Sequence, residues 1–464
     1  MMTRHAHAYG LSGSLHNTWL EIASVTAILI TLSAAAAHGQ IAGALNFGGA
    51  PGVYLDLQGN VRCREIDAND RLAAMRARIK AAGDSGKNEK LVYLSLPKLL
   101  NQARDLRAAG KEIPDELRFL GGLTSIRYVF ALPEDKDLVI AGPAEPWIIV
   151  QGKDDVATFA IGTRTGRPTL QLDDLIVALR TARDGGGNLF GCGIYPSPDS
   201  VKIADEIVHR LAGAPRAERM KALADGLGPQ PVKIFGTRDD TRLGYICVAA
   251  DYEMKRFALG MDHAPIAGLG SAMDNSRSAI NKFWFVAKYE PLLVAKDGNA
   301  FEIRGQRLGL ECGAFDFDPR GATETAKHYA GQFTKNMTSL AAAEPLFAEL
   351  QNIADEALLG NLLLHDRLAE KVGWDDAWLF DDAKFPVAKV PVPKTADTLV
   401  AFTSGSLVAG GVTLTLPPFV DEKSRQSDDK GSLDTPRADF AKLRQAEKAT
   451  GNEAGTVIRA KASP

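Results

Sequence analysis

Short β-prone runs alternate with helix-forming runs along most of the chain, and this alternation restricts the fold more than any other feature of the sequence. The β-prone runs are rich in Val, Ile and aromatic residues and are bounded by Gly, Pro, Asn or Asp, as strands usually are. The helical runs repeat apolar residues every three or four positions. Strands separated by helices indicate a mixed α/β (α+β) fold. We expect two sheet-containing lobes, a C-terminal helical pair and a disordered tail.

The predicted strands are residues 53–57, 61–66, 125–132, 137–141, 147–150, 156–161, 189–195, 232–235, 243–250, 283–288, 292–295, 300–304 and 412–420. The predicted helices are residues 69–82, 96–109, 172–183, 198–211, 216–227, 252–259, 323–340 and 345–372. Gln58, Gly59 and Asn60 suit the turn of a hairpin between the first two strands. The strands between 283 and 304 are expected to form an antiparallel meander.

The predicted organisation is a signal peptide (1–37), an N-terminal α+β domain (48–185), an alternating α/β domain (186–320), the helical pair (321–373), a Pro-interrupted β segment (374–420) and a disordered charged tail (421–464). About two positions in five of this tail are charged. So few apolar groups cannot offset the entropy of ordering the tail, and we expect at most a frayed helix at 438–449.

The N-terminal sequence predicts an export signal. An apolar stretch of about 15 residues begins at Ile22 and ends at Ala37. It is shorter than the roughly 20 residues that span a bilayer as a helix, and Ala35 and Ala37 are small enough for a signal peptidase. We therefore predict cleavage after Ala37 and a periplasmic or extracellular protein that meets the membrane only during export. An uncleaved anchor or a buried helix is the alternative.

The cysteines do not indicate a metal site. Cys63, Cys192, Cys247 and Cys312 are far apart and form no C-x-x-C pair. Export would permit two disulfides with three possible pairings. The apolar or glycine-rich surroundings of the last three instead favour buried free thiols for at least two of them.

Familiar catalytic and cofactor motifs are missing from the sequence. None of the eight His forms H-E-x-x-H, and no serine has the flanking glycines of G-x-S-x-G. Residues 83–87 resemble a phosphate loop, but the first glycine is missing and Asn88 replaces the Ser or Thr that would hold magnesium. We expect no cofactor and no metal. The net charge of −3 gives no basic field for nucleic acid.

Three carboxylates are candidate catalytic groups. Glu145 lies in a rigid turn at 142–147, where Trp147 is a candidate binding residue. Asp173 and the candidate binding residue Asp174 begin the helix 172–183, although stabilisation of the helix dipole explains them sufficiently. Asp251 follows the predicted strand 243–250, and sites in open α/β sheets lie at the carboxyl ends of strands.

Basic side chains near these carboxylates are candidate binding residues. Lys255 and Arg256 follow Asp251, and a surface ion pair between Asp251 and Lys255 is the alternative interpretation. Arg167, together with Arg164, Thr165 and Gln171, is a candidate for an anion-binding entrance to the helix that begins at 172.

Several ordered segments resemble an exported, planctomycete-type family known only as a domain of unknown function. The segments are 117–123, 128–130, 139–147, 166–175, 249–256, 283–285 and 343–350. The resemblance covers about residues 48–370 and implies export and a shared fold, but no activity, cofactor or catalytic residue. Pro146 replaces an expected Gly, and the region after Pro386 is unusually rich in proline.

Two functions follow from these observations. The first is a non-catalytic binding or structural protein of the cell envelope, with an envelope protein or glycan as its partner. The alternative is an unfamiliar envelope hydrolase that uses Glu145, Asp173 or Asp251 as paired acid and base. Convergence of the candidate residues on one concave pocket would favour an enzyme or ligand-binding protein.

Overall fold

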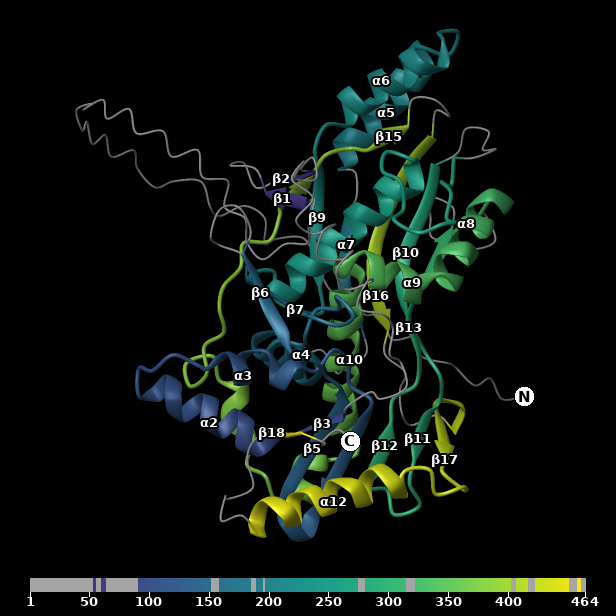
Figure 1. Ribbon diagram of the computed structural model, residues 1–464. Coiled ribbons are helices and arrows are strands. Elements are labelled where there is room, and N and C mark those ends of the chain that lie inside the picture. Colours follow the sequence, from purple (N-terminus) through teal and green to yellow (C-terminus); the bar gives the residue numbers. More distant parts are fainter. Residues whose placement is uncertain are drawn as a thin grey trace, which may run out of the picture. The chain divides into compact units, whose positions relative to one another are not determined.

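The computed structural model describes residues 53–55, 60–63, 91–151, 158–184, 189–194, 197–273, 280–313, 322–401, 406–415, 422–449 and 457–459 (Figure 1). The predicted signal peptide and the predicted helix 69–82 lie outside the described residues. All described residues belong to one contact unit, residues 44–464.

The first large sheet joins strands from distant parts of the chain. Its order is β1 (Val53–Leu55), β2 (Asn60–Cys63), β14 (Thr395–Ala396), β9 (Gln230–Phe235), β8 (Leu189–Ile194), β16 (Ser406–Thr415), β10 (Ile280–Tyr289) and β13 (Gly305–Gly313), with β15 (Val400–Ala401) paired to β16. β16 lies antiparallel to β8 and parallel to β10, so the sheet is mixed. β1 and β2 form the predicted hairpin.

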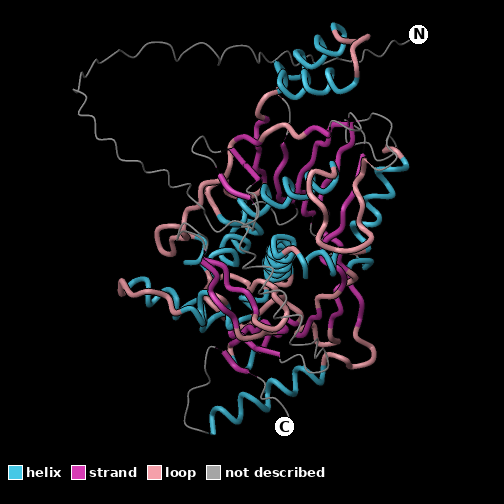
Figure 2. The backbone as a smooth tube through the Cα atoms, turned by 45° about the horizontal axis from the view of Figure 1, so that its top comes forward, coloured by secondary structure: helices cyan, strands magenta, loops and turns pink. Residues whose placement is uncertain are grey.

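The second large sheet is also mixed. Its order is β17 (Arg425–Ser427), β11 (Leu292–Val294), β12 (Ala300–Glu302), β4 (Tyr128–Leu132), β5 (Asp137–Pro143), β3 (Leu91–Ser95) and β18 (Val457–Arg459). β6 (Trp147–Gln151) and β7 (Thr158–Gly162) form a separate antiparallel pair. With the helices, these sheets confirm the predicted α+β fold; Figure 2 shows the strands in groups with helices between them.

The α-helices of the described residues are α2 (Leu96–Ala108), α3 (Asp115–Arg118), α4 (Leu172–Asp184), α5 (Pro198–Arg210), α6 (Arg216–Leu227), α7 (Arg242–Leu259), α8 (Glu324–Lys335), α9 (Met337–Ala343), α10 (Pro345–His365), α11 (Leu368–Lys371) and α12 (Asp434–Ala449). Short 3-10 turns occupy Leu120–Gly122, Pro133–Asp135, Ala377–Phe380 and Glu422–Ser424. Ser95 caps α2 and Ser197 caps α5, as their sequences indicate. No helix of this described set has the length and apolarity needed to cross a membrane.

The helix α10 is buried along nearly its whole length. Residues 345–363 are all buried, and the helix packs against α4, α7 and β13. A helix buried on all sides is normally apolar all round. α10 nevertheless carries Glu349, Asp355 and Glu356 in its interior, so these carboxylates require partners inside the protein.

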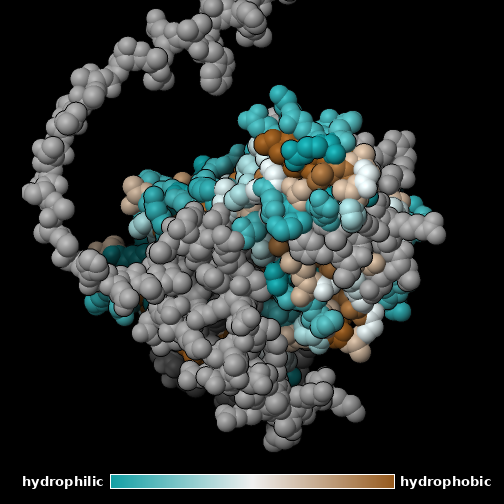
Figure 3. Space-filling view, turned by 90° about the horizontal axis from the view of Figure 1, so that it is seen from above, coloured by the Kyte–Doolittle hydropathy of each residue, from teal (hydrophilic) through white to brown (hydrophobic). Residues whose placement is uncertain are grey.

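By contrast, α5 and α6 form a hairpin around their own small core of Ile207 and Leu223. Ile203 and Val208 of α5 remain exposed, and the view from above shows brown hydrophobic side chains among hydrophilic ones (Figure 3).

The strand predicted at 243–250 and the short helix after it are wrong: these residues form the single helix α7. Thr241 caps its start, and Gly260, with φ of 67°, ends it in the left-handed conformation. Nearly every residue of α7 is buried, so the helix lacks the polar face that would have marked its period. Asp251 therefore lies within a helix, not at the end of a strand.

Two further expectations need correction. β10 pairs with β13 and β16 in the first sheet, whereas β11 and β12 form a hairpin in the second, so the predicted meander is divided between sheets. Within the predicted disordered tail, residues 425–427, 434–449 and 457–459 form β17, α12 and β18. Few apolar side chains are enough to order this segment, because Leu433 and Phe440 are both buried against the second sheet.

The carboxylate of Asp355 joins α10 to both sheets. It accepts hydrogen bonds from Tyr289 Oη at 2.9 Å, from Arg307 Nε at 3.1 Å and from the backbone N–H of Ile126 at 3.0 Å. Tyr289 and Arg307 belong to the first sheet, and Ile126 leads into β4 of the second. Arg307 adopts φ of 70° beside a bulge in β13, a left-handed conformation that costs about 1 kcal/mol.

Replacing Asp355 by Ala should destabilise the protein by about 3 to 5 kcal/mol, because it leaves the partly buried Arg307 and the buried N–H of Ile126 without their carboxylate. The measurement is the free energy of unfolding in urea. Asp205→Ala, at an exposed position of α5, is the matched control and should change stability by less than about 0.5 kcal/mol. Similar small effects of both substitutions would contradict the role assigned to Asp355.

Candidate functional site

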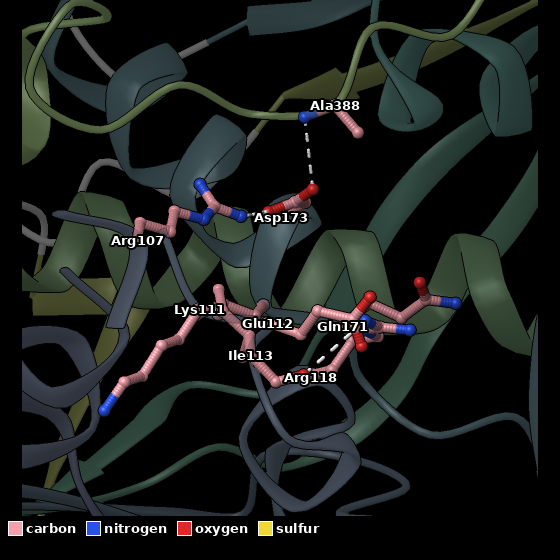
Figure 4. A pocket seen from close by; sticks show the side chains of 9 residues that line it. Arg107, Lys111, Glu112, Ile113, Arg118, Gln171, Asp173 and Ala388 are labelled. Atoms are coloured by element: carbon pink, nitrogen blue, oxygen red, sulfur yellow. Dashed lines mark hydrogen bonds and ion pairs between the residues drawn. The ribbon is translucent and has the colours of Figure 1, made fainter. Parts of the chain in front are cut away.

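An open pocket lies where α2, the segment 111–118 and the first turn of α4 meet. It has a volume of about 420 Å³ and is lined by Arg107, Lys111, Glu112, Ile113, Arg118, Gln171, Leu172, Asp173 and Ala388 (Figure 4). Five of these side chains are charged, and the lining as a whole comes from three parts of the chain, residues 107–118, residues 171–173 and Ala388. The sequence candidate Asp173 is thus placed in a cavity with basic neighbours. We call this cavity the α4 pocket.

One wall of the α4 pocket is fixed by Asp173. Its carboxylate accepts a hydrogen bond from Arg107 Nη2 at 2.7 Å and another from the backbone N–H of Ala388 at 3.2 Å. Arg107 also bonds the carbonyl of Pro386 and lies over the ring of Phe385, 4.2 Å from its centroid. Asp173 and Arg107 therefore hold the Pro-rich segment against α4, and neither is free to bind a ligand alone.

The remaining charges of the α4 pocket are more accessible. Lys111 and Glu112 are exposed and form no ion pair with other described residues. Arg118 lies near the carboxylate of Asp115 at 3.6 Å, and its side chain is 46% exposed. Arg107 is paired with Asp173 and Arg118 with Asp115, so the lining charges largely compensate one another. The pocket can offer two cations to an acidic ligand.

A cluster of buried charges lies on the inner side of the same turn of α4. Arg242 of α7 contacts the carboxylate of Asp174 and lies 2.6 Å from Glu349 Oε1 of α10. Burial would lower the pKa of Arg242, but these carboxylates raise it above its ordinary value. Glu356, also on α10, lies in the electrostatic range of the same guanidinium. The guanidinium of Arg242 is therefore the shared counterion of three carboxylates, those of Asp174, Glu349 and Glu356.

Burial shifts the pKa values of the carboxyl groups in this cluster upward. Burial raises the pKa of Glu349 to about 7 and that of Glu356 well above its ordinary value, although Arg242 opposes the shift. Burial likewise raises the pKa of Asp174. A separate carboxyl, Glu253, has its pKa raised to about 8 by burial and by the nearby Glu344 and Asp262. Glu349 and Glu253 therefore release their protons at a higher pH than ordinary carboxyl groups do.

The candidates Asp251 and Lys255 form a buried ion pair. Lys255 Nζ lies 2.7 Å from Asp251 Oδ2, and both side chains are at most 4% exposed. Gly410 of β16 allows this, because a Cβ there would lie 2.4 Å from Asp251 Oδ1. The neighbouring candidate Arg256 instead binds Asp262 at 2.5 Å. The predicted surface pair is therefore an interior one.

The carboxylate of Glu145 is bound by the turn that contains Arg164 and Thr165. The backbone N–H groups of Arg164 and Thr165 donate to Glu145 Oε2 at 2.5 and 2.9 Å, and the hydroxyl of Thr165 donates to Oε1. This is part of the anion-binding entrance that the sequence suggested, and here the anion is the protein's own side chain. Trp147 packs its ring against Phe119.

The candidate residues do not converge on one pocket. Arg167 donates to Gln351 of α10 at 2.9 Å, Asp174 belongs to the buried cluster, and Asp173 lines the α4 pocket. Each of the three candidate catalytic carboxylates is bound by a different set of groups. Among the described residues, no group of three or more His, Cys, Asp or Glu is placed to hold a metal. Cys192, Cys247 and Cys312 are buried free thiols, as expected for at least two of them.

Sequence reasoning missed the basic side chains of the α4 pocket and the partners of the buried cluster. Lys111 follows Gly110, and Arg118 lies four residues after Pro114. This short polar segment carries no motif that would mark either residue as functional. Glu349, Asp355 and Glu356 did leave a signal, because they interrupt the apolar run of a long predicted helix. Acidic residues in such a helix indicate buried ion pairs or a functional site.

Residues 192–271 match the family model described as "Protein of unknown function (DUF1598)". The matched segment runs from β8 to the loop after α7, so it contains Arg242 and the Asp251–Lys255 pair. No curated protein and no solved structure matches the chain. The match supports the resemblance to a domain of unknown function and assigns the segment no biochemical role.

The free energy of unfolding should fall as the pH rises from 5 to 8. Between the ordinary Glu pKa of 4.5 and about 7, folded Glu349 keeps a proton that the unfolded chain has released. Raising the pH then favours the unfolded state by roughly 1.4 kcal/mol per unit for each such group. Glu349→Gln should therefore reduce the loss between pH 5 and 8 by roughly 2 to 3 kcal/mol. Urea unfolding at each pH measures this.

The exposed Glu324→Gln substitution is the control for this experiment and should leave the pH profile unchanged. Identical profiles for the wild type and Glu349→Gln would show that Glu349 is already ionised at pH 5.

Gly162→Ala should destabilise the protein by about 1 to 3 kcal/mol, because the new Cβ would lie 2.4 Å from Cδ of the anchored Glu145. Gly331→Ala in α8 meets nothing within 4 Å and should stabilise by about 0.5 to 1 kcal/mol. Thermal unfolding of the two variants measures the difference. A neutral Gly162→Ala would mean that Glu145 moves freely.

Proposed function

We propose that the chain is an exported, non-catalytic binding protein of the cell envelope, whose α4 pocket takes an acidic group of an envelope glycan or peptide. The observation that carries this proposal is the pairing of Arg107 with Asp173, which leaves the exposed Lys111 and Arg118 as the accessible cations of the pocket. Cationic side chains in a partly enclosed pocket attract carboxylate or phosphate groups. Export is supported by the predicted signal peptide.

The hydrolase alternative gains no support from the described residues. Glu145 and Asp251 are buried, and both are bound by groups of their own chain. A general acid or base must reach the substrate within hydrogen-bond distance. A binding protein needs only the accessible wall of the α4 pocket, and it needs neither a cofactor nor nucleic acid.

A thermal-shift comparison of glucuronate with glucose tests the proposal on protein that begins at residue 38. Glucuronate at ten times its Kd should add about 1.4 kcal/mol and raise the Tm by about 1 to 3 °C, whereas glucose should leave it unchanged. The double variant Lys111→Gln/Arg118→Gln should lose most of this rise. Lys221→Gln, which removes an exposed cation on α6, is the matched control and should keep it.

The same measurement with a short acidic peptide and its amidated form covers peptide ligands. No rise with either acidic probe would contradict the proposed function. A rise that survives in Lys111→Gln/Arg118→Gln would place the binding site outside the α4 pocket.

A further inference from the structure

The first turn of α4 is held from within by ionic contacts. Arg242 of α7 lies between Asp174 of α4 and Glu349 of α10 and contacts the carboxylate of each, and all three side chains are at most 14% exposed. The outer side of the same turn reaches solvent, because Asp173 is 32% exposed and lines the α4 pocket with Gln171 (Figure 4). A single turn of helix therefore separates the buried cluster from the pocket.

The carboxyl groups of this cluster have few donors that could stabilise a further negative charge. Asp174 Oδ1 and both oxygens of Glu349 and of Glu356 are buried without a hydrogen-bond partner among the described residues. Arg242 is in ionic contact with Glu349, and the backbone of Gln171 acts on Glu356. A buried carboxylate is tolerated only when it is paired and hydrogen-bonded. The protonated cluster is therefore compact, whereas the fully ionised cluster repels itself.

The surroundings of the two glutamates supply one cation between them. The charged and titratable side chains that act on Glu349 are Arg242 and Tyr245 of α7, Asp174 of α4 and Glu344, which precedes α10. Those that act on Glu356 are Arg242, Asp174 and Asp355, and Asp355 is itself bound by Arg307 of β13. α9 has no titratable side chain, and α11 follows the opposite end of α10. Burial, Asp174 and Glu344 together raise the pKa of Glu349 to about 7, although Arg242 opposes the shift.

Neutral contacts fix the chain just before the first turn of α4. The backbone N–H groups of Thr169 and Leu170 donate to carbonyls of neighbouring segments at 3.0 and 2.7 Å, and the amide of Asn352 donates to the carbonyl of Pro168 at 3.1 Å. None of these groups titrates near neutral pH, so they hold residues 168–170 in place throughout that range. The turn that follows can therefore move while the segment before it stays fixed.

We propose that the cluster of Arg242, Asp174, Glu349 and Glu356 is a pH-sensitive latch on the first turn of α4. Its protonated form holds the turn against α10, and its ionised form releases the turn through repulsion between Glu349 and Asp174. Release moves one wall of the α4 pocket, which residues 171–173 form. The latch requires no ligand, so it does not depend on the proposed function.

Hydrogen exchange of the full chain at pH 5 and pH 7 tests the latch. The N–H groups of residues 175–178 donate to carbonyls of the first turn, as that of Leu175 does to Gln171 at 3.0 Å, so their exchange reports its opening. Folded Glu349, with its pKa raised to about 7, keeps a proton that it releases when the turn opens. After correction for the intrinsic pH dependence of amide exchange, this group should raise the opening constant of residues 175–178 by roughly 40-fold between pH 5 and 7.

Glu349→Gln should remove this part of the increase, and Glu356→Gln is a second variant that should reduce the increase. Glu324→Gln, at the exposed start of α8, is the matched control and should keep it. Residues 357–363 of α10 report global unfolding in the same experiment. Opening constants for residues 175–178 equal to those for 357–363 would show that the turn opens only when the whole protein unfolds, and this would overturn the proposal. The full increase retained in Glu349→Gln would overturn it as well.

Discussion

One buried carboxylate, that of Asp355, holds together parts of the chain that lie far apart in the sequence. Its donors come from β10, from β13 and from the residue that leads into β4, so a single side chain connects α10 with both large sheets. A buried charge is tolerable only when its hydrogen bonds are complete. The position of α10 relative to the two sheets is therefore specified by donor geometry as well as by apolar packing.

The position of α10 also determines what α4 presents to solvent. α4 packs against α10, and successive residues of its first turn point in different directions. Asp174 turns inward to Arg242, whereas Asp173 turns outward to Arg107 and the α4 pocket. The accessible pocket and the most strongly perturbed carboxyl groups thus share one turn of helix. The matched family segment contributes Arg242 to this arrangement but none of the residues that line the pocket.

Local signals made much of the fold predictable. The hairpin at β1 and β2, the helix α2 with its Ser95 cap and the amphipathic helix α4 were predicted correctly, because their turns, caps and periods lie within a few residues. The prediction of a strand at 243–250 was wrong because α7 is buried all round and has no polar face to show its helical period. β10 was assigned to the wrong neighbours because strand pairing depends on residues more than 100 positions away, such as β16.

The site was less predictable than the fold for the same reason. Asp173 and Asp251 were recognised as candidates from their local surroundings, yet their roles depend on Arg107 and on the backbone of β16. Lys111 and Arg118 become part of a pocket only because the fold places the start of α4 beside them. Single-sequence reasoning therefore found charged groups with a local signal, such as Asp173 and Asp251, and missed partners from distant parts of the chain, such as Arg107 and Glu349.

The two outermost strands of the second sheet, β17 and β18, come from residues 425–427 and 457–459 and follow every other strand of that sheet in the sequence. Until β17 and β18 are added, β11 and β3 are open edges, and open edges pair readily with other chains. A nascent or truncated chain that ends before residue 422 would therefore be the aggregation-prone form of this protein. Its solubility then depends on how quickly β17 and β18 follow, and any chaperone that protects this sheet would act in that interval.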